Sequence, residues 1–326
     1  MANSTPLHVV TGKGGTGKTT VAAALALALA GAGRSVLLCE VEGRQGLAQV
    51  FDVPPLPYEE RRIATSDAGG HVHALAIDAE AALLEYLQMY YRLGRAGRAL
   101  DKFGVIDFAT TIAPGVRDVL LTGKVYEAAR RRRDGKTGPF VYDAVVVDAP
   151  PTGRITRFLG VNDDVAGLAR VGPIKTQSES IMSMMRGPQT CVHLVTVLEE
   201  MPVQETLDGI AELHREGLPV GHVVVNQVRP TLLSADTVSA LESGRLEAKT
   251  VAPVLAGVGL PEAAAPVLVR DGLGHLERQR LQDEQAAIIA GAGRPHVDLP
   301  LVTDGIDLGS LQDLAALLAP LTEDAR

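Results

Sequence analysis

Residues 12–20 read GKGGTGKTT and match the phosphate-binding pattern G-x-x-x-x-G-K-[ST] at every position. The apolar run at residues 7–11 (LHVVT) predicts a short buried strand before this loop. The alanine- and leucine-rich run at residues 21–32 predicts a helix after it. A phosphate-binding loop requires this order of strand, loop and helix. The stretch therefore predicts an α/β fold with a nucleotide site at the end of its first strand.

The residues of this loop have distinct expected roles. Its glycines let backbone N–H groups surround phosphate oxygens, and the N-terminus of the following helix favours negative charge. Lys18 is expected to reach the β- and γ-phosphates, and the Thr19 hydroxyl is expected to bind Mg²⁺. The expected ligands are therefore ATP or ADP with Mg²⁺, in a P-loop NTPase. The residues expected to contact the nucleotide here are Gly12, Lys13, Gly14, Gly15, Thr16, Gly17, Lys18, Thr19 and Thr20.

Strand-like apolar runs alternate with helical stretches along most of the chain. This alternation predicts a doubly wound, mainly parallel sheet flanked by helices. We expect one domain over residues 1–326, with a helical insertion at about 79–135 and a further helical segment at about 174–190. Residues 232–285 are helical by composition but otherwise uninformative. The expected strands are residues 7–11, 36–41, 74–77, 144–148, 192–198 and 222–226.

Composition argues against several classes of protein. The net charge of −8 disfavours a general nucleic-acid or anionic-membrane surface. The arginine run at residues 130–133 precedes a Gly- and Pro-containing loop, which favours a solvated helix end. We find no signal-peptide pattern and no apolar run long enough to span a membrane, so no integral membrane segment is expected. The only two cysteines, Cys39 and Cys191, form no disulfide framework and favour the cytoplasm.

A second buried strand, expected at residues 144–148 (AVVVD), ends in a carboxylate. This is the form of a Walker B element, whose aspartate holds the Mg²⁺ shell. Asp148 is therefore expected to act with Thr19 at the metal. The alternative is an aspartate that serves only a strand-end turn.

The second lysine of the loop, Lys13, narrows the class of ATPase. The form K-G-G-x-G-K-[ST]-[ST] resembles the deviant phosphate loop of a family that includes arsenite-pump, tail-anchored-protein-targeting, partitioning and division-site ATPases and nitrogenase iron proteins. In that family this lysine reaches across a dimer interface to the nucleotide of the other subunit. The resemblance therefore implies a dimer in which Lys13 acts in trans. A cation supplied in this way stabilises charge on the transferring phosphoryl group.

Two further segments resemble the switches of the same family. Residues 149–153 (APPTG) resemble switch II, which implies that the Gly153 amide senses the γ-phosphate and relays its loss. Residues 38–47 (LCEVEGRQGL) align with switch I, whose water-activating aspartate falls on Glu42. A glutamate places its carboxylate about one methylene further out, and a general base must lie within hydrogen-bond reach of the water. The rate of hydrolysis by this chain is therefore an open question. The role of Arg44 is also open, either as a residue that stabilises charge or as an ordinary surface residue.

The late part of the chain resembles the base-binding elements of the arsenite-pump and targeting branch. Val-Asn-Gln at 225–227 places Asn226 where that branch contacts adenine, with a strand-end turn as the alternative. Residues 297–301 (VDLPL) resemble the strand and loop that close over the base, which implies contacts from Pro300 and Leu301. The segment IAPG before Asp118 resembles the same branch.

Within the branch, the motifs look most like those of an actinobacterial subgroup that assembles from paired, unlike subunits. The resemblance implies a homodimer or a heterodimer with a paralogous ATPase. The two isolated cysteines provide neither a zinc-binding C-x-x-C, nor the paired cysteines of an iron–sulfur reductase, nor the cysteine triplet of an arsenite pump. No zinc or iron–sulfur cluster is therefore expected.

Two helices suggest what such an ATPase handles. Methionine-rich helices suit an adaptable groove, and the comparable helices of the targeting ATPases hold a client's membrane helix. We therefore expect that ATP closes the dimer around an apolar groove for a hydrophobic protein client and that hydrolysis opens it. Ordinary packing of two amphipathic helices is the alternative. The residues concerned are Leu84, Leu87, Met89, Tyr90, Tyr91, Met182, Met184 and Met185.

Two other functions compete with a switch ATPase. A nucleotide-binding regulatory subunit with weak turnover is favoured by the substitution at Glu42. A partitioning or division-site ATPase would need a basic DNA-binding surface or a basic C-terminal helix, and residues 311–320 carry no lysine or arginine.

Overall fold

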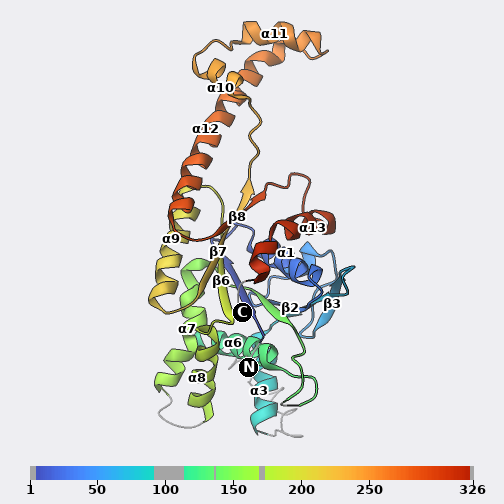
Figure 1. The fold of residues 1–326 in the computed structure, drawn as a ribbon, viewed down its shortest axis with the longest axis vertical. Coiled ribbons are helices and arrows are strands. Elements are labelled where there is room, and N and C mark those ends of the chain that lie inside the picture. The colour runs from blue at the N-terminus through green and yellow to red at the C-terminus, as the bar shows by residue number, and fades with distance from the viewer. Residues whose placement is uncertain (1–4, 92–113, 136, 169–172, 324–326) are drawn as a thin grey trace.

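The computed structural model describes residues 5–91, 114–135, 137–168 and 173–323. Its centre is an eight-stranded sheet in the order β3-β4-β2-β5-β1-β6-β7-β8 (Figure 1). β3 pairs antiparallel with β4, and the other pairs are parallel. The strands are β1 (Leu7–Gly12), β2 (Ser35–Glu40), β3 (Arg61–Thr65), β4 (His71–Ala76), β5 (Ala144–Asp148), β6 (Thr190–Thr196), β7 (Val220–Val228) and β8 (His296–Pro300).

Helices cover both faces of this sheet and create two apolar cores. The first core contains α1, α2 and α13, and the second contains α6, α7 and α8. The central strands β1, β2, β5 and β6 are buried along their whole length, as expected for parallel strands covered on both faces. The helices are α1 (Lys18–Gly31), α2 (Gly46–Val50), α3 (Ala79–Tyr91), α6 (Pro114–Arg130), α7 (Thr152–Leu168), α8 (Pro173–Met185), α9 (Glu200–Arg215), α10 (Ala235–Glu242), α11 (Ala248–Gly257), α12 (Ala265–Gly291) and α13 (Leu308–Leu317), with 3₁₀ turns η1 (Glu262–Ala264) and η2 (Ala319–Glu323).

This architecture confirms the predicted doubly wound sheet. Each of the six expected strands is present, with ends that differ by up to three residues. The antiparallel edge strand β3 was not anticipated. The helical insertion corresponds to α3 and α6, but residues 92–113 lie outside the described part of the chain. The division into one domain with an insertion therefore stays a prediction.

A helical arm between β7 and β8 is the main feature that the sequence did not indicate. It consists of α10, α11, η1 and α12, and it projects from one end of the sheet (Figure 1). α12 has 27 residues, which corresponds to about 40 Å at 1.5 Å per residue. Its C-terminal end returns to the body, where Ile289 is buried against Val203 and Val223. At the tip, Val254 and Val258 are exposed.

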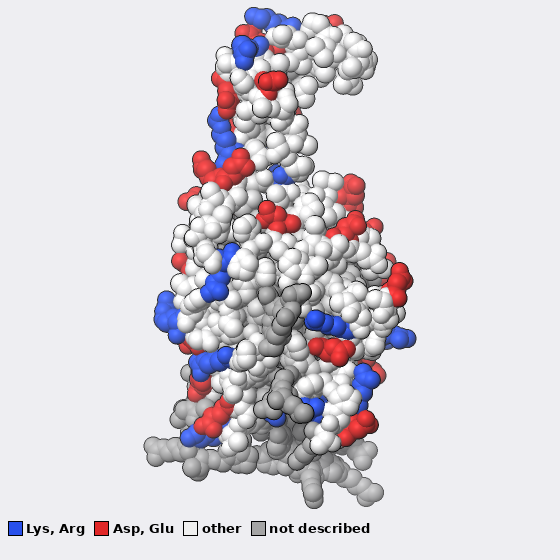
Figure 2. Space-filling view, in the orientation of Figure 1, with Lys and Arg blue, Asp and Glu red and all other residues white. Residues whose placement is uncertain are grey.

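Charged side chains of both signs are interspersed on the face of the molecule shown in Figure 2. Over the described residues on this face, lysine and arginine do not merge into one continuous basic field. The sign distribution is that of an ordinary solvated surface, and the end of the arm is covered mainly by uncharged residues.

Candidate nucleotide-binding site

The phosphate loop joins β1 to α1 at the carboxyl edge of the sheet, where ligands of doubly wound folds bind. Two of its glycines are required by space. A Cβ on Gly12 would lie 2.1 Å from the carbonyl oxygen of Val195. A Cβ on Gly17, whose φ is +88°, would lie 2.3 Å from Nδ2 of Asn226. The loop is therefore held closely between β6 and β7, and only glycine fits at these two positions.

The two loop lysines are held very differently. Lys18 is 8% exposed, and its Nζ donates to the carbonyl oxygen of Lys13 at 3.4 Å. Burial lowers the pKa of Lys18, although the carboxylates of Asp148 and Glu42 oppose this shift. Lys13 lies near the surface, and its Nζ is 3.7 Å from Oε2 of Glu205 on α9. Lys18 is thus placed within the loop, whereas Lys13 is attached to the body by one partly exposed ion pair.

Thr19 and Asp148 meet at the N-terminus of α1. The Thr19 hydroxyl donates to Oδ2 of Asp148 at 2.6 Å. Burial raises the pKa of Asp148 to about 6, while the Thr19 hydrogen bond and the Lys18 charge oppose the shift. The described residues contain no group of three or more histidine, cysteine or acidic side chains able to hold a metal. Mg²⁺ does not require such a group, because it commonly uses one or two side chains, waters and substrate phosphates.

The switch I segment lies between β2 and α2, close to the phosphate loop. Oε2 of Glu42 is 3.7 Å from a guanidinium nitrogen of Arg44, and the Glu42 side chain is 18% exposed. The backbone amide and carbonyl of Leu56 both hydrogen-bond to the side chain of Gln45, which fixes the following turn. Gly46 packs against Thr19, since a Cβ there would lie 3.1 Å from the Thr19 methyl. Switch I is therefore close to the phosphate loop through Gly46, and the role of Glu42 as a base stays a prediction.

The switch II segment connects the site to the helices below the sheet. The Thr11 hydroxyl donates to the carbonyl oxygen of Pro150 at 2.7 Å. Gly153 is the second residue of α7, and the next residue, Arg154, lies 3.7 Å from the buried carboxylate of Asp118 on α6. Burial raises the pKa of Asp118, and the charge of Arg154 opposes this shift. Switch II is thus joined directly to the helical insertion.

The residues expected around the base lie at the ends of β7 and β8. The buried amide Nδ2 of Asn226 donates to the carbonyl oxygen of Thr16 at 2.9 Å, so this side chain anchors the phosphate loop. Pro300 ends β8, and the backbone amide of Leu301 donates to the carbonyl oxygen of Val228 at 2.9 Å. Base contacts from Asn226, Pro300 and Leu301 stay predictions.

Two residues at this site were missed by the sequence interpretation. Glu40, the last residue of β2, is 2% exposed, and its Oε2 accepts a hydrogen bond from the backbone amide of Leu47 at 3.2 Å. A carboxylate within an otherwise apolar buried strand is a signal that the sequence did provide. Glu205, the partner of Lys13, gave no such signal because their contact joins segments far apart in the chain.

Comparison with known proteins agrees with this geometry. The family model for anion-transporting ATPases matches residues 6–188, which include the phosphate loop, switch I, Asp148 and switch II. The chain belongs to this family. The ATPase BagA of Mycobacterium tuberculosis is 54% identical over 315 residues, which cover 96% of this chain and 92% of the relative.

More distant relatives of this ATPase family match a smaller part of the chain. A relative from Prosthecochloris vibrioformis, described as an arsenical pump-driving ATPase, is 26% identical over 67% of this chain and 60% of the relative. The ATPase get3 of Botryotinia fuckeliana is 27% identical, over 62% of this chain and 55% of the relative. Nucleotide binding and a P-loop ATPase fold are the properties that members of this family share.

A cavity of about 660 Å³ lies between α3, α6 and α8, below the sheet. Leu83, Val116, Leu120 and Ile181 supply apolar walls. Met182, Met184 and Met185 do not line this cavity; they are at most 4% exposed, and the last two pack in the second core. Met184 borders a second cavity of about 600 Å³, so a role of the methionines in a client groove stays a prediction. The side chains of residues 86–91, including Leu87, Met89, Tyr90 and Tyr91, lie outside the described part.

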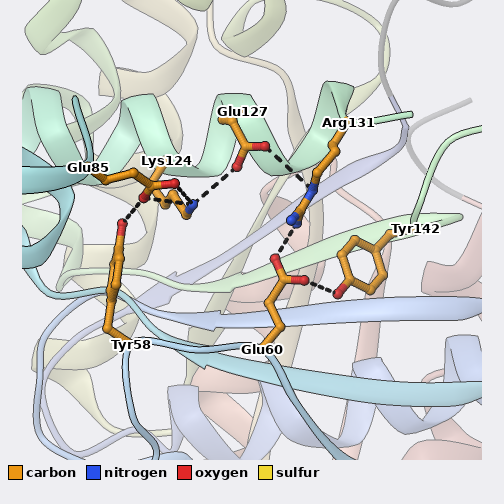
Figure 3. Close-up of polar contacts among 7 residues, drawn as sticks. All are labelled: Tyr58, Glu60, Glu85, Lys124, Glu127, Arg131 and Tyr142. Atoms are coloured by element: carbon orange, nitrogen blue, oxygen red, sulfur yellow. Dashed lines mark hydrogen bonds and ion pairs between the residues drawn. The ribbon is translucent and has the colours of Figure 1, made fainter. Parts of the chain in front are cut away.

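An ion-pair network borders the same cavity (Figure 3). Nζ of Lys124, whose side chain is 13% exposed, lies 2.8 Å from Glu85 and 3.3 Å from Glu127. Burial alone would lower the pKa of Lys124, but the hydrogen bond to Glu85 and the charge of Glu127 raise it. The network is formed by Tyr58, Glu60, Glu85, Lys124, Glu127, Arg131 and Tyr142.

None of the helices that the structure describes combines the length and the apolar character needed to cross a bilayer.

Proposed function

We propose that this protein is a Mg²⁺-dependent ATPase that works as a dimer and couples its nucleotide state to an apolar site for a hydrophobic client. The observation that carries the ATPase part is the contact of Thr19 with Asp148 beneath a glycine loop that admits no side chain at Gly12 or Gly17. This arrangement supports phosphate binding by backbone amides next to a cation site. We propose the cytoplasm as its compartment.

Each loop residue has a separate task in this proposal. Lys18 contacts the terminal phosphates from its buried position, and the N-terminal amides of α1 bind phosphate oxygens. Thr19 and Asp148 hold the metal, which when bound neutralises charge on the phosphate oxygens. Glu42 orients the attacking water and accepts its proton, provided that its carboxylate leaves the ion pair with Arg44.

The dimer part of the proposal depends on Lys13. Within one chain this lysine pairs with Glu205 across an exposed gap of 3.7 Å. Such pairs contribute about 0.2–1 kcal/mol, so a phosphate of a second subunit competes easily for the ammonium group. The partner is a second copy or a paralogous chain, in line with the similarity to ATPases of paired subunits.

The coupling between nucleotide and client passes through α7. This helix begins at switch II with Thr152 and Gly153, and its Asn162 lines the cavity. The nine steps of helix from Gly153 to Asn162 correspond to about 14 Å. The amide of Asn162 donates to the Thr122 hydroxyl of α6 at 3.0 Å, and Arg154 pairs with Asp118 of the same helix. A movement of switch II therefore displaces α6 and with it the cavity wall.

The size of the cavity supports a client site shared between subunits. A membrane-spanning helix about 30 Å long and 10 Å wide occupies about 2,400 Å³. The cavity of one chain offers about 660 Å³. This cavity therefore holds about a quarter of such a helix, and we propose that the facing surface of a second subunit contributes to the complete site.

A regulatory subunit with weak turnover is the second candidate. It is supported by the ion pair between Glu42 and Arg44, which must break before Glu42 can act as a base. In this case the chain binds nucleotide tightly, and a paralogous partner performs most of the hydrolysis.

The deciding experiment is Mg²⁺-ATP hydrolysis by the purified chain, compared with Lys18→Ala and with the exposed control Lys249→Ala. Lys249 lies on the arm and pairs only with Glu247 among the described residues. Turnover lost in Lys18→Ala and retained in Lys249→Ala supports a self-sufficient ATPase. ATP binding without turnover supports the regulatory subunit, and absence of nucleotide binding would refute both.

The dimer and client are tested separately. Sedimentation of wild type and Lys13→Ala with and without ATP measures nucleotide-dependent association, which Lys13→Ala is expected to abolish. Binding of a fluorescent hydrophobic helical peptide is then measured with ATP and with ADP. Equal binding in the two nucleotide states, for the homomer and for the heteromer, would refute coupling to a client.

A further inference from the structure

The buried carboxylate of Glu40 has one oxygen without a function in the ATPase as described so far. Oε2 accepts the backbone amide of Leu47, but Oε1 is buried and has no hydrogen-bond partner among the described residues. A buried carboxylate oxygen without a partner is strongly unfavourable. The position of this side chain at the carboxyl edge of the sheet points to a ligand that supplies the missing hydrogen bond.

Strand register places Glu40 next to the proposed metal site. Glu40 of β2 is the direct partner of Asp148 of β5, and neighbouring strands lie about 4.8 Å apart. Alternate residues of a strand share a face. The preceding residues of that parity, Leu38 and Val146, both pack in the core that contains α1. Glu40 and Asp148 therefore extend the same face, towards the helix that carries Thr19.

The local contacts bring the other components to the same place. Asp148 accepts the Thr19 hydroxyl, Leu47 follows Gly46, and Gly46 packs against Thr19. The two strand ends, α1 and the start of α2 thus converge around one small volume. Two carboxyl groups thus lie side by side next to the expected phosphates, and oxygen ligands of this kind suit a hard cation such as Mg²⁺.

We propose that Glu40 is a positioning residue of the Mg²⁺ site, whose free Oε1 accepts a hydrogen bond from a water molecule on the cation. This inference rests on the proposed nucleotide site. Mg²⁺ keeps several of its waters when it binds to proteins, and acceptors around such a shell commonly change metal affinity 10–100-fold. Asp148 and Glu40 orient the shell from two adjacent strands, while Leu47 fixes the second Glu40 oxygen and so links the shell to switch I.

The alternative is a purely structural role, in which Glu40 only accepts the amide of Leu47. Glu40→Gln separates the two roles because glutamine has nearly the same shape and keeps one acceptor oxygen for that amide. It replaces the free oxygen with an NH₂ group, which cannot accept a hydrogen bond from a water. A structural role predicts unchanged or higher stability and unchanged metal dependence. A metal role predicts selective loss of metal affinity.

The experiment measures binding of a fluorescent ADP analogue in EDTA and at increasing Mg²⁺ concentrations. In EDTA, Glu40→Gln is expected to bind the nucleotide at least as well as wild type, because one negative charge is removed. The Mg²⁺ concentration that gives half of the metal-dependent increase is expected to rise about 10–100-fold. The exposed arm residue Glu247, changed to Gln, is the matched control.

Each outcome has a defined meaning. An unchanged Mg²⁺ dependence in Glu40→Gln would overturn the inference, as would an equal loss of affinity with and without Mg²⁺. If Glu40→Gln fails to fold, Glu40→Asp keeps the charge with a shorter reach, and an unchanged Mg²⁺ dependence there would overturn it. A wild-type protein that binds no nucleotide would instead refute the proposed function, so the two failures are distinguishable.

Discussion

Replacing Asn226 with alanine should weaken the binding of every phosphate ligand, and not only of adenine nucleotides. The Asn226 amide donates to the carbonyl oxygen of Thr16 at 2.9 Å in a buried position. Its removal leaves that carbonyl without a partner, which costs about 1–3 kcal/mol. In the variant this cost favours a disordered phosphate loop in the free protein. Binding of a phosphate must then order the loop again, which reduces the affinity. The affinity is therefore expected to fall by about 5- to 150-fold, at 1.4 kcal/mol per factor of ten.

The assay compares the affinity of Asn226→Ala for ATP and for inorganic tripolyphosphate, which has no base. A loop anchor predicts the same fold-loss for both ligands. A contact with adenine alone predicts weaker ATP binding and unchanged tripolyphosphate binding, and this result would refute the anchoring argument. Gln279→Ala is a suitable control, because among the described residues its amide nitrogen bonds only to Asp283, within α12 of the arm.

Three further predictions concern the loop and the cavity. Glu205→Gln releases Lys13, and ATP-dependent association should strengthen by up to about fivefold, the equivalent of 1 kcal/mol; unchanged or weaker association in sedimentation would contradict this. Gly12→Ala places a Cβ 2.1 Å from a carbonyl oxygen of β6 and should lower the unfolding free energy by about 1–3 kcal/mol. The control Gly14→Ala has open space around its Cβ and should leave the unfolding free energy nearly unchanged. Both values are measured by denaturant unfolding without nucleotide. For Glu85, burial raises the pKa, but hydrogen bonds from its lysine and tyrosine partners lower it below its usual value overall. Its stabilisation of about 0.2–1 kcal/mol should therefore be complete above about pH 4.3 and be lost as pH falls through the lower folded pKa. The difference in unfolding free energy between wild type and Glu85→Gln should shrink only on that acid side, and a difference that persists at low pH would refute the assignment.

The parts of the fold that the sequence predicted are those controlled by local pattern. The phosphate loop needs glycine at Gly12 and Gly17 because a Cβ at either position would lie 2.1 or 2.3 Å from an atom of β6 or β7. The central strands are continuous apolar runs because helices cover both of their faces. The constraints come from distant segments, but the patterns that they leave in the sequence, a glycine motif and apolar runs, are local and can be recognised without the tertiary structure.

The features that were missed depend on contacts between distant segments. β3 is an edge strand whose burial is slight, so its residues lack the apolar run of a central strand. The methionines of α8 have the same pattern whether they line a groove or fill a core, and in this structure Met184 and Met185 pack in the core. The arm was visible only as helical composition, because nothing local specifies that α12 leaves the body and returns at Ile289.

The two loop lysines differ in how firmly the chain holds them, and this difference suggests why hydrolysis would require a second subunit. Lys18 is buried and held by a loop carbonyl, so its ammonium group needs little rearrangement to meet a phosphate. Lys13 is about one third exposed and is held only by Glu205 at 3.7 Å among the described residues. A partly exposed ion pair contributes at most about 1 kcal/mol. The pair with Glu205 is therefore too weak to prevent Lys13 from binding a stronger anion. A triphosphate presented by a second subunit is such an anion. If Lys13 acts in trans, each chain therefore binds nucleotide with its own Lys18. The contact of Lys13 with a phosphate then requires association with a second subunit.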